Sequence, residues 1–387
     1  MSQHRIPAVF MRGGTCNAIV FHQKDLPADR ALWDDIFLAA IGSPDPYGRQ
    51  LDGMGGGYTS VSKVCVIGPP TRTDADIDYT FAQIPVQEDR VEYGANCGNM
   101  SSAMGPFAVD EGLVKVSGSE ALVRIHNTNT KKIIIARFPV INGVAAVDGE
   151  LEIPGVTGTG APVSLEFVSP GGATTGKLLP TGNVRDILDV PGMGKVEVSM
   201  VDAANACVFV RARDIGLTGT ELPSVTEANT DAMRNLEAIR IAASVAMGIT
   251  RNAAEAATRL TNPAIGFVAP PQDAALLSGA TLKADQVDLT GRMIARGQAH
   301  RDMPLTRTLC MAVAARLVGS VVYESARATT HPEEALRIGM PSGVLTAAAQ
   351  VSYRDGVWVA ERGSFLRTQR RLFEGNVLVP ALGLAPA

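Results

Sequence analysis

The sequence predicts a mixed α/β (α+β) fold made of two similar, strand-rich lobes. With 387 residues, the chain exceeds the length at which one hydrophobic core usually keeps growing, so two domains are expected. Its first half carries many short runs with strand-like alternation and few helical patterns. Residues 200–209 repeat the order of residues 10–21, which is apolar, then small and polar, then apolar. This favours an internal duplication with domains 1–187 and 188–387, although such a pattern also arises by chance.

The first lobe is predicted to be a largely antiparallel sheet with one early helix. The helix covers residues 29–41, and the glycine-rich residues 53–57 are predicted to form a flexible loop. Short strands are expected where β-branched or alternating residues lie between turn residues, at 7–10, 18–22, 64–67, 121–126, 133–140 and 163–168. The first two of these strands flank a turn at Gly13 and Gly14.

The second lobe is predicted to combine strands with longer helices. Asp, Pro and Gly interrupt residues 184–194, and the domain boundary is placed there. Amphipathic helices are expected at 231–247 and at 304–318, the second with Pro304 in its first position. A strand, a turn and a strand are expected in 195–210, and two more strands at 344–352 and 357–361 around an Asp355–Gly356 turn. Regular βαβ alternation is not predicted.

Charge and composition exclude several classes of partner. Lys plus Arg number 35 and Asp plus Glu number 39, so the formal charge is −4, and no long basic run is available to neutralise phosphates. We therefore expect no nucleic-acid partner. The first residues show no signal-peptide pattern, and no apolar run reaches the ~18 residues of a membrane span, so a cytoplasmic protein with no membrane partner is expected.

The motifs predict neither a metal site nor an organic cofactor. The five cysteines include no Cys-x-x-Cys pair, and the five histidines lack the spacing of metal ligands. Residues 171–178 resemble a phosphate-binding loop, but Leu178 stands where a Ser or Thr would bind magnesium, and no helical pattern follows. No Gly-x-Gly-x-x-Gly fingerprint lies between a strand and a helix.

Cys97 is a candidate catalytic residue because of its neighbours. It lies in Asn96-Cys97-Gly98-Asn99, directly before small residues that can begin a helix. At a helix N-terminus the dipole and the free N–H groups stabilise a thiolate, and the same N–H groups can hold a carboxylate. The alternative is a buried structural cysteine, which is the usual fate of a free thiol. A Cys-His hydrolase stays open, but no histidine lies nearby in the sequence.

Lys63 is the second candidate. It follows a polar segment and leads into the apolar strand at 64–67, so burial of its side chain would make it a better base. The alternative is a lysine whose ammonium group simply reaches water at the end of a strand.

Several motifs, in order along the chain, resemble the 2-methylaconitate cis-trans isomerase family. They are Met11-Arg12-Gly13-Gly14-Thr15, residues 41–56, Ser62-Lys63, Asn96-Cys97-Gly98-Asn99, residues 179–183, residues 267–271 and Pro341-Ser342-Gly343. The resemblance covers nearly the whole chain. It implies a diaminopimelate epimerase-like fold, in which each lobe is a sheet around a helix and the active site lies in the cleft between the lobes. It also implies an enzyme that works without a metal or a cofactor.

The resemblance assigns proton transfer to Lys63 and Cys97. A base would remove a proton next to a carboxylate, or conjugated to it, and the resulting dienolate would rotate or be reprotonated elsewhere. The expected donors to the developing charge are Gly13, Gly14, Gly98 and Asn99, and the expected carboxylate-binding cations are Arg12 and Arg301. The other expected substrate contacts are Thr15, Cys16, Met303, Ser342 and Gly343.

The sequence departs from the family pattern at two places. Cys16 and Asn17 stand where the family often has Ser and then Lys or Arg, so a cation near the substrate is expected to be missing. Met303 stands where the epimerases have a second cysteine. A single thiol fits an isomerase better than a racemase that needs two.

The expected substrate is a small unsaturated di- or tricarboxylate. The long match over residues 41–56 favours 2-methylaconitate, an intermediate of the methylcitrate pathway of propionate breakdown. The alternatives are a 4-oxalomesaconate tautomerase or another allylic isomerase and, in a different class, a non-catalytic carboxylate-binding protein. A homodimer is expected, since it is common among such lobed enzymes.

Overall fold

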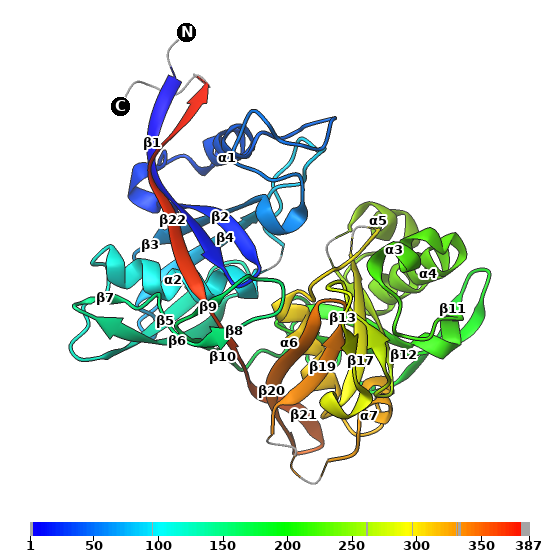
Figure 1. Cartoon of the computed structure of the whole chain (residues 1–387). Helices are drawn as coiled ribbons and strands as arrows, with labels where there is room; N and C mark the ends of the chain where they lie inside the picture. Colours follow the sequence, from blue (N-terminus) through cyan, green and yellow to red (C-terminus); the bar gives the residue numbers. More distant parts are fainter. Residues whose placement is uncertain are drawn as a thin grey trace. The chain divides into compact units, whose positions relative to one another are not determined.

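The chain forms two compact units in the computed structural model, which describes residues 3–94, 96–260, 262–295, 297–329, 331 and 334–380. The first unit is Met1–Leu165 together with Leu366–Ala387, and the second is Glu166–Phe365. This division differs from the predicted boundary after residue 187, which falls inside a strand of the second unit. The last strand belongs to the first unit because it pairs antiparallel with the first strand (Figure 1).

The first unit consists of a mixed sheet with two helices. Its elements are β1 (Gln3–Gly13), β2 (Cys16–His22), α1 (Trp33–Ile41), β3 (Lys63–Gly68), β4 (Ile77–Gln83), α2 (Gly98–Asp110), β5 (Glu120–Asn127), β6 (Lys132–Ile141), β7 (Val144–Ala145), β8 (Leu151–Glu152), β9 (Thr159–Gly160) and β22 (Gln369–Pro380). β10 (Val163–Val168) carries the chain into the second unit. The six strands predicted for the first lobe and its helix are therefore confirmed, the helix beginning at Trp33 after a short 3-10 turn.

The sheet is largely antiparallel, as predicted, but it also contains two parallel pairs, which were not predicted. β1–β2, β3–β4 and β5–β6 are antiparallel, whereas β2–β3 and β4–β5 are parallel. The reason is the length of the connections. α1 and a long loop join β2 to β3, and α2 joins β4 to β5, and such crossovers allow the next strand to run in the same direction.

The second unit repeats this pattern of pairing. Its elements are β11 (Asp186–Val190), β12 (Gly194–Ala203), β13 (Asn205–Arg211), α3 (Pro223–Ala228), α4 (Thr230–Ala246), α5 (Ala253–Thr258), β14 (Ala264–Ala269), β15 (Ala274–Ala275), β16 (Thr281–Leu282), β17 (Leu289–Ala295), β18 (Gln298–Ala299), α6 (Leu305–Ala314), α7 (Val321–Ser325), β19 (Leu336–Met340), β20 (Gly343–Arg354) and β21 (Val357–Arg367). Along β12, β13, β14, β17, β19 and β20 the pairs are antiparallel, parallel, antiparallel, parallel and antiparallel, as in β1 to β6. The two units therefore share one topology, as the internal duplication predicts.

The helices and strands predicted for the second lobe are also present. α4 lies within one residue of the predicted range at each end. α6 ends at Ala314, earlier than predicted, and Pro304 is its N-cap rather than its first residue. The Asp355–Gly356 turn joins β20 to β21, and both turn residues have positive φ.

One buried helix forms the centre of each unit. In α2 every residue from Gly98 to Val109 is buried, and the helix contacts β1, β2, β5 and β6. In α6 all residues are buried, and the helix contacts β12, β13 and β20. In each unit the strands therefore pack around the central helix.

The glycine-rich segment that was predicted to be a flexible loop is held by hydrogen bonds. Met54 and Gly55 donate their backbone N–H groups to carbonyls of α1, over 2.9 and 3.0 Å. The buried Gln50 side chain accepts from the Gly57 N–H and from the Ser62 hydroxyl. Ser62 immediately precedes Lys63, so this segment fixes the start of β3.

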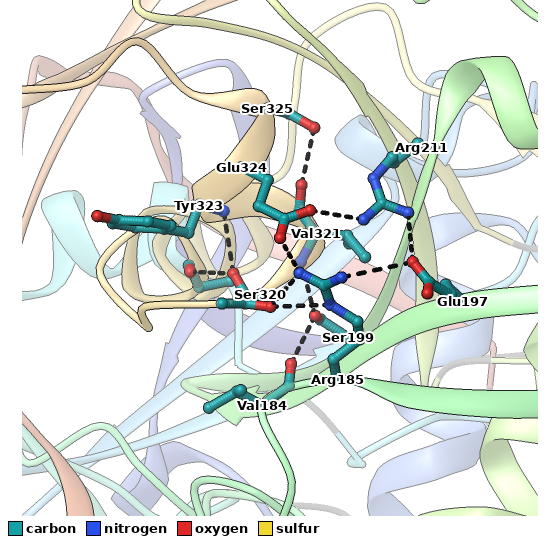
Figure 2. Close-up of polar contacts among 12 residues, drawn as sticks. Val184, Arg185, Glu197, Ser199, Arg211, Ser320, Val321, Tyr323, Glu324 and Ser325 are labelled. Carbon is teal, nitrogen blue, oxygen red and sulfur yellow. Dashed lines mark hydrogen bonds and ion pairs between the residues drawn. The ribbon is translucent and has the colours of Figure 1, made fainter.

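A polar network connects the strands of the second unit to α7 (Figure 2). Arg211 contacts Glu197 at 2.8 Å and Glu324 at 2.7 Å, and Arg185 pairs with both carboxylates as well. The side chains of Glu197 and Glu324 are 42% and 43% exposed, so solvent screening leaves these ion pairs a small contribution to stability.

Ser199 lies inside the same network and is fully buried. Its hydroxyl donates to the Val184 carbonyl at 2.6 Å and accepts from the Val321 N–H at 3.0 Å (Figure 2). Both backbone groups would lose a partner if the hydroxyl were removed.

We predict that Ser199→Ala destabilises the protein by about 1–3 kcal/mol, the cost of leaving buried polar groups unsatisfied. Denaturant unfolding of the full chain followed by far-UV circular dichroism measures the change. Ser224→Ala, at an exposed position in α3, is the control and should shift the free energy of unfolding by less than about 0.5 kcal/mol. Equal midpoints for the two variants would contradict this role of Ser199.

Candidate functional site

Cys97 lies at the beginning of the central helix of the first unit. It is the N-cap of α2, with φ −102° and ψ 98°, and it is half-buried, whereas the other four cysteines are buried. The prediction that a helix begins directly after Cys97 is confirmed. The side chain therefore lies beside the free backbone N–H groups of the first helical turn.

The surroundings of Cys97 favour its thiolate. A hydrogen bond from the Cys16 thiol, the charge of Lys63 and the backbone N–H groups of Met100 and Asn99 together lower the pKa of Cys97 to about 6, although burial opposes the shift. At neutral pH Cys97 is therefore mostly a thiolate. Such a sulfur is a usable base and nucleophile.

Cys16 is the neighbour that keeps its proton. Its Sγ lies 4.0 Å from Cys97 Sγ, and the residue is only 6% exposed. The hydrogen bond to Cys97 and its own burial raise the pKa of Cys16 well above the ordinary range of a thiol. Within the pair, the proton is therefore favoured on Cys16 and the thiolate on Cys97.

Lys63 is the first residue of β3 and is buried. Its ammonium group donates to the Thr59 carbonyl at 2.7 Å and to the Gln83 side-chain oxygen at 2.8 Å, and it lies 5.6 Å from the centroid of the Phe81 ring. Both acceptors are neutral oxygens, so the charge is held in place without being neutralised by them. The alternative of a lysine that reaches water does not hold.

Gln83 contacts Lys63 and was not among the predicted site residues. It pairs with Lys63 across the β3–β4 ladder. Its side-chain nitrogen donates to the carbonyls of Thr59 and Ser62, so its oxygen is turned toward Lys63. Only the strand register could have revealed it, because nothing in the local sequence marks this glutamine.

The Gly13–Gly14 turn packs directly on the first turn of α2. A Cβ on Gly13 would lie 2.6 Å from the Asn99 carbonyl oxygen, and one on Gly14 would lie 2.1 Å from Asn99 Oδ1. Gly14 also has φ +51°, which disfavours other residues. These glycines let the strand β2, with Cys16 at its start, approach Cys97.

Asn99 and Thr15 form the polar edge of the same site. The Asn99 amide nitrogen donates to the Thr15 hydroxyl oxygen at 3.2 Å. Arg367, which was not predicted, donates from Nε to Asn99 Oδ1 at 3.1 Å. The sequence offers no sign of it, since it lies 268 residues after Asn99.

Arg12 lies beside the turn, where it contacts backbone. Its Nη1 donates to the Gly14 carbonyl at 3.0 Å and to the carbonyl and hydroxyl of Thr368 at 3.1 and 3.0 Å. Among the residues that the structure describes, its Nη2 has no recorded partner, which leaves a donor for a carboxylate.

The other predicted substrate contacts belong to the second unit. Arg301 is exposed and Met303 is buried just before α6, where the Met303 N–H lies 3.4 Å from Met340 Sδ. Ser342 and Gly343 follow Met340 at the β19–β20 turn, and the Ser342 hydroxyl is buried without a hydrogen-bond partner in the described ranges. These four residues therefore gather near the beginning of α6. The predicted cleft between the lobes stays a prediction.

Asn205 and Thr306 were not predicted and occupy the corresponding place in the second unit. The Asn205 amide nitrogen donates to the Thr306 hydroxyl in the first turn of α6, at 2.6 Å. Asn205 is 3% exposed, and its Oδ1 has no partner within the described part of the chain. An asparagine and a threonine thus meet at the beginning of both central helices.

The glycine-rich segment at 171–178 does not hold its N–H groups ready for a phosphate. Thr174 and Thr175 donate theirs to the Asp202 carboxylate, at 2.8 and 2.6 Å, and no helix follows. The rejection of a phosphate-binding loop agrees with these contacts. Within the described ranges no three His, Cys, Asp or Glu side chains are grouped to hold a metal ion, and no helix there combines the length and apolar character of a membrane span.

One cavity of the described structure lies apart from these groups. It has a volume of about 810 Å³ and is lined by residues of β1, α1, β22 and the 42–52 loop. Neither Lys63 nor Cys97 lines this cavity.

Comparison with known proteins identifies relatives over the full length of the chain. The model of the family described as "PrpF protein" matches residues 3–380. The chain is 43% identical over 379 residues to the 3-methylitaconate isomerase of Eubacterium barkeri, covering 97% of this chain and 98% of the relative. It is 36% identical over 389 residues to the 2-methyl-aconitate isomerase of Shewanella oneidensis, covering 98% of each. The 4-oxalomesaconate tautomerase of Pseudomonas putida is 36% identical over 379 residues, covering 98% of this chain and 97% of the relative.

Solved structures match the fold as well. The crystal structure of a methylitaconate-delta-isomerase has a TM-score of 0.83 and 42% identity, covering 100% of this chain and 98% of the other. A hydroxyproline epimerase from Agrobacterium vitis has a TM-score of 0.54 and 13% identity, covering 98% and 94%, which is a likeness of fold alone. The predicted family resemblance and the epimerase-like fold are confirmed.

We predict that Cys97 is the first cysteine to react with iodoacetamide in the native protein, with a rate that is half-maximal at about pH 6. The thiolate is the reactive form, so the rate rises as the pH rises through the pKa of Cys97. Peptide mass spectrometry after short exposures measures the labelling of each cysteine. Lys63→Met should move the midpoint upward, because it removes a positive charge. A midpoint near pH 8.5 in the wild type would contradict the assignment.

Proposed function

The chain belongs to the PrpF family and is an isomerase, and from that premise we propose that it moves a proton within an unsaturated di- or tricarboxylate, with 2-methylaconitate as its substrate. The observation that carries this proposal is the position of Cys97 at the N-cap of α2, where the helix N–H groups and the charge of the buried Lys63 lower the pKa of its thiol. A base next to a fixed positive charge suits removal of a proton from carbon.

In the proposed first step Cys97 Sγ takes a proton from the carbon between the double bond and a carboxylate. The electrons of the broken C–H bond enter a dienolate, in which the former double bond has single-bond character. Rotation about that bond, followed by return of the proton from Cys97, exchanges the cis and trans forms. The proton could instead return to the far carbon of the former double bond, rather than to the carbon that lost it. That return would move the double bond.

Lys63 is proposed to stabilise the negative charge in both states. It is held by Thr59 and Gln83, and its third N–H has no recorded acceptor among the described residues. The ammonium group can therefore serve the thiolate before the proton transfer and the dienolate after it. Its hydrogen bonds fit this role better than the predicted role of Lys63 as the base, which no observation tests.

The substrate carboxylates are proposed to lie at the first turn of α2 and beside the turn before β2. The N–H of Gly98 has no recorded acceptor among the described residues, and it lies at a helix N-terminus, which attracts anions, next to the Asn99 N–H that already faces the Cys97 sulfur. Arg12 and Thr15 add donors from the turn. Arg301, Met303, Ser342 and Gly343 stay proposed contacts from the second unit.

A second candidate substrate is 3-methylitaconate, because the relative that bears this name has the higher identity, 43% against 36% for the 2-methyl-aconitate isomerase. The first proton transfer is the same for both acids, and they differ in where the proton returns. Catalysis without a cofactor, a homodimeric assembly and a cytoplasmic location complete the proposal.

We expect incubation in D₂O to distinguish these substrates. Each of 2-methylaconitate, 3-methylitaconate and 4-oxalomesaconate is followed by ¹H NMR, and the proposed substrate should change double-bond geometry without uptake of water. Partial deuterium incorporation is expected, because a shielded thiol returns some of the same proton. Turnover of 3-methylitaconate alone would keep the reaction class and replace the substrate, whereas binding without conversion of any acid would refute catalysis.

We further predict that Cys97→Ala and Lys63→Met each lower kcat by roughly 10² to 10⁴-fold, the usual contribution of a proton-transfer group. In the wild type, kcat/KM should fall as the pH falls through about 6, because the thiolate is then protonated. Lys115→Met, which removes an exposed lysine, is the matched control and should keep wild-type turnover. Near-normal activity of Cys97→Ala would exclude Cys97 as the base.

A further inference from the structure

Arg367 lies directly behind the site and is buried. It is the last residue of β21 and is only 6% exposed, and its Nε donates to Asn99 Oδ1 over 3.1 Å. Asn99 is itself 5% exposed. Burial of a charged side chain carries a large desolvation cost, which its polar contacts must offset.

The contact with Arg367 decides which way the Asn99 amide points. A guanidinium group has only donors, whereas an amide has an oxygen that accepts and a nitrogen that donates. The oxygen of Asn99 must therefore face Arg367. The nitrogen then faces the other side, where it donates to the Thr15 hydroxyl oxygen at 3.2 Å.

The orientation of Asn99 in turn decides what Thr15 can offer. A hydroxyl group has one hydrogen to donate and lone pairs to accept with. Because the amide occupies a lone pair of Thr15, the hydroxyl hydrogen is left for another acceptor. No such acceptor is recorded among the described residues, and Thr15 is half-buried at the edge of the site.

Close packing keeps this arrangement from relaxing. A Cβ on Gly14 would come within 2.1 Å of Asn99 Oδ1 and 3.1 Å of Arg367 Cδ. The turn, the amide and the arginine stem therefore lie in van der Waals contact, and the amide has little room to rotate.

We propose that Arg367 is a positioning residue, which acts through Asn99 to aim the Thr15 hydroxyl hydrogen at a carboxylate oxygen of the substrate. The chain of donors runs from Arg367 to Asn99 to Thr15 and ends at the ligand. This inference rests on the proposed function in one respect, that the ligand is a carboxylate. Arg367 thereby affects the affinity for the ligand without contacting the ligand itself.

Binding of tricarballylate, a saturated tricarboxylate that cannot be isomerised, tests the inference by calorimetry in a double-mutant cycle. Arg367→Met should weaken binding about 10-fold, the value of a hydrogen bond to a charged group. In the Thr15→Val background, the same change should weaken binding less than about 2-fold, because the last donor is already missing. Arg5→Met, which removes an exposed charge from β1, is the control and should bind like the wild type.

Kinetics with the converted acid provide a second readout. Arg367→Met should raise KM about 10-fold and leave kcat within about 3-fold, since Cys97 and Lys63 are unchanged, whereas general loosening of the fold would lower kcat as well. If Arg367→Met does not fold, Arg367→Gln gives the same cycle, because a glutamine can donate or accept and no longer dictates the amide orientation. Rescue by Arg367→Lys, which keeps donors only, is expected.

Three outcomes would overturn the inference. They are unchanged binding in Arg367→Met, a loss of the same size in the Thr15→Val background, and no binding of tricarballylate by the wild type. The calorimetric cycle needs no turnover. Failure of the proposed function, seen as no conversion of any acid, is therefore distinguishable from failure of the positioning role.

Discussion

The site of the first unit depends on the close approach of the Gly13–Gly14 turn to the first turn of α2. A side chain at either glycine would overlap Asn99, the nearest distances being 2.6 and 2.1 Å. Because this contact is made by backbone, it fixes the start of β2 relative to the helix more firmly than side-chain packing would. Cys16 is thereby held 4.0 Å from Cys97, and Thr15 within reach of Asn99. The chemistry of the thiol pair therefore depends on glycine at both positions of the turn.

Two cysteines so close together have opposite proton affinities because their surroundings differ. The Cys97 sulfur accepts hydrogen bonds from N–H groups of α2 and is stabilised as a thiolate by the positive charge of Lys63. Cys16, in contrast, lies on a strand and is deeply buried. Lys63 can act at this range because its recorded hydrogen-bond acceptors, in the part of the chain that the structure describes, are the neutral oxygens of Thr59 and Gln83. A carboxylate in their place would have neutralised the ammonium group and weakened its effect on the thiolate.

Local sequence patterns predicted the elements well and their assembly less well. The helix after Cys97 and the strand after Lys63 could be predicted because glycine, small residues and β-branched residues act over a few positions. The parallel pairs were missed because strand direction depends on crossovers, which periodicity does not encode. Gln83 and Arg367 were missed for a related reason. Each reaches the site through pairing or packing with residues distant in the sequence, and neither stands in a motif.

The two units share one topology but differ in the residues at the beginning of their central helices. Both central helices begin beside a tight turn between two antiparallel strands, and at both an asparagine amide donates to a threonine hydroxyl, Asn99 to Thr15 and Asn205 to Thr306. The residue types are exchanged, since the asparagine is on the helix in the first unit and on the strand in the second.

The residues at the N-caps of α2 and α6 also differ, and this difference has a larger effect on the chemistry than the exchange of asparagine and threonine. Cys97 caps α2, whereas α6 is capped by Pro304, the residue after Met303, and a proline has neither a thiol nor a backbone N–H. A racemase that inverts a carbon needs an acid on one face and a base on the other. An isomerase that removes a proton and returns it needs a single group. A single thiol at a helix N-cap is therefore compatible with isomerisation, and the beginning of α6 has instead the buried Asn205 Oδ1, which has no recorded partner among the described residues.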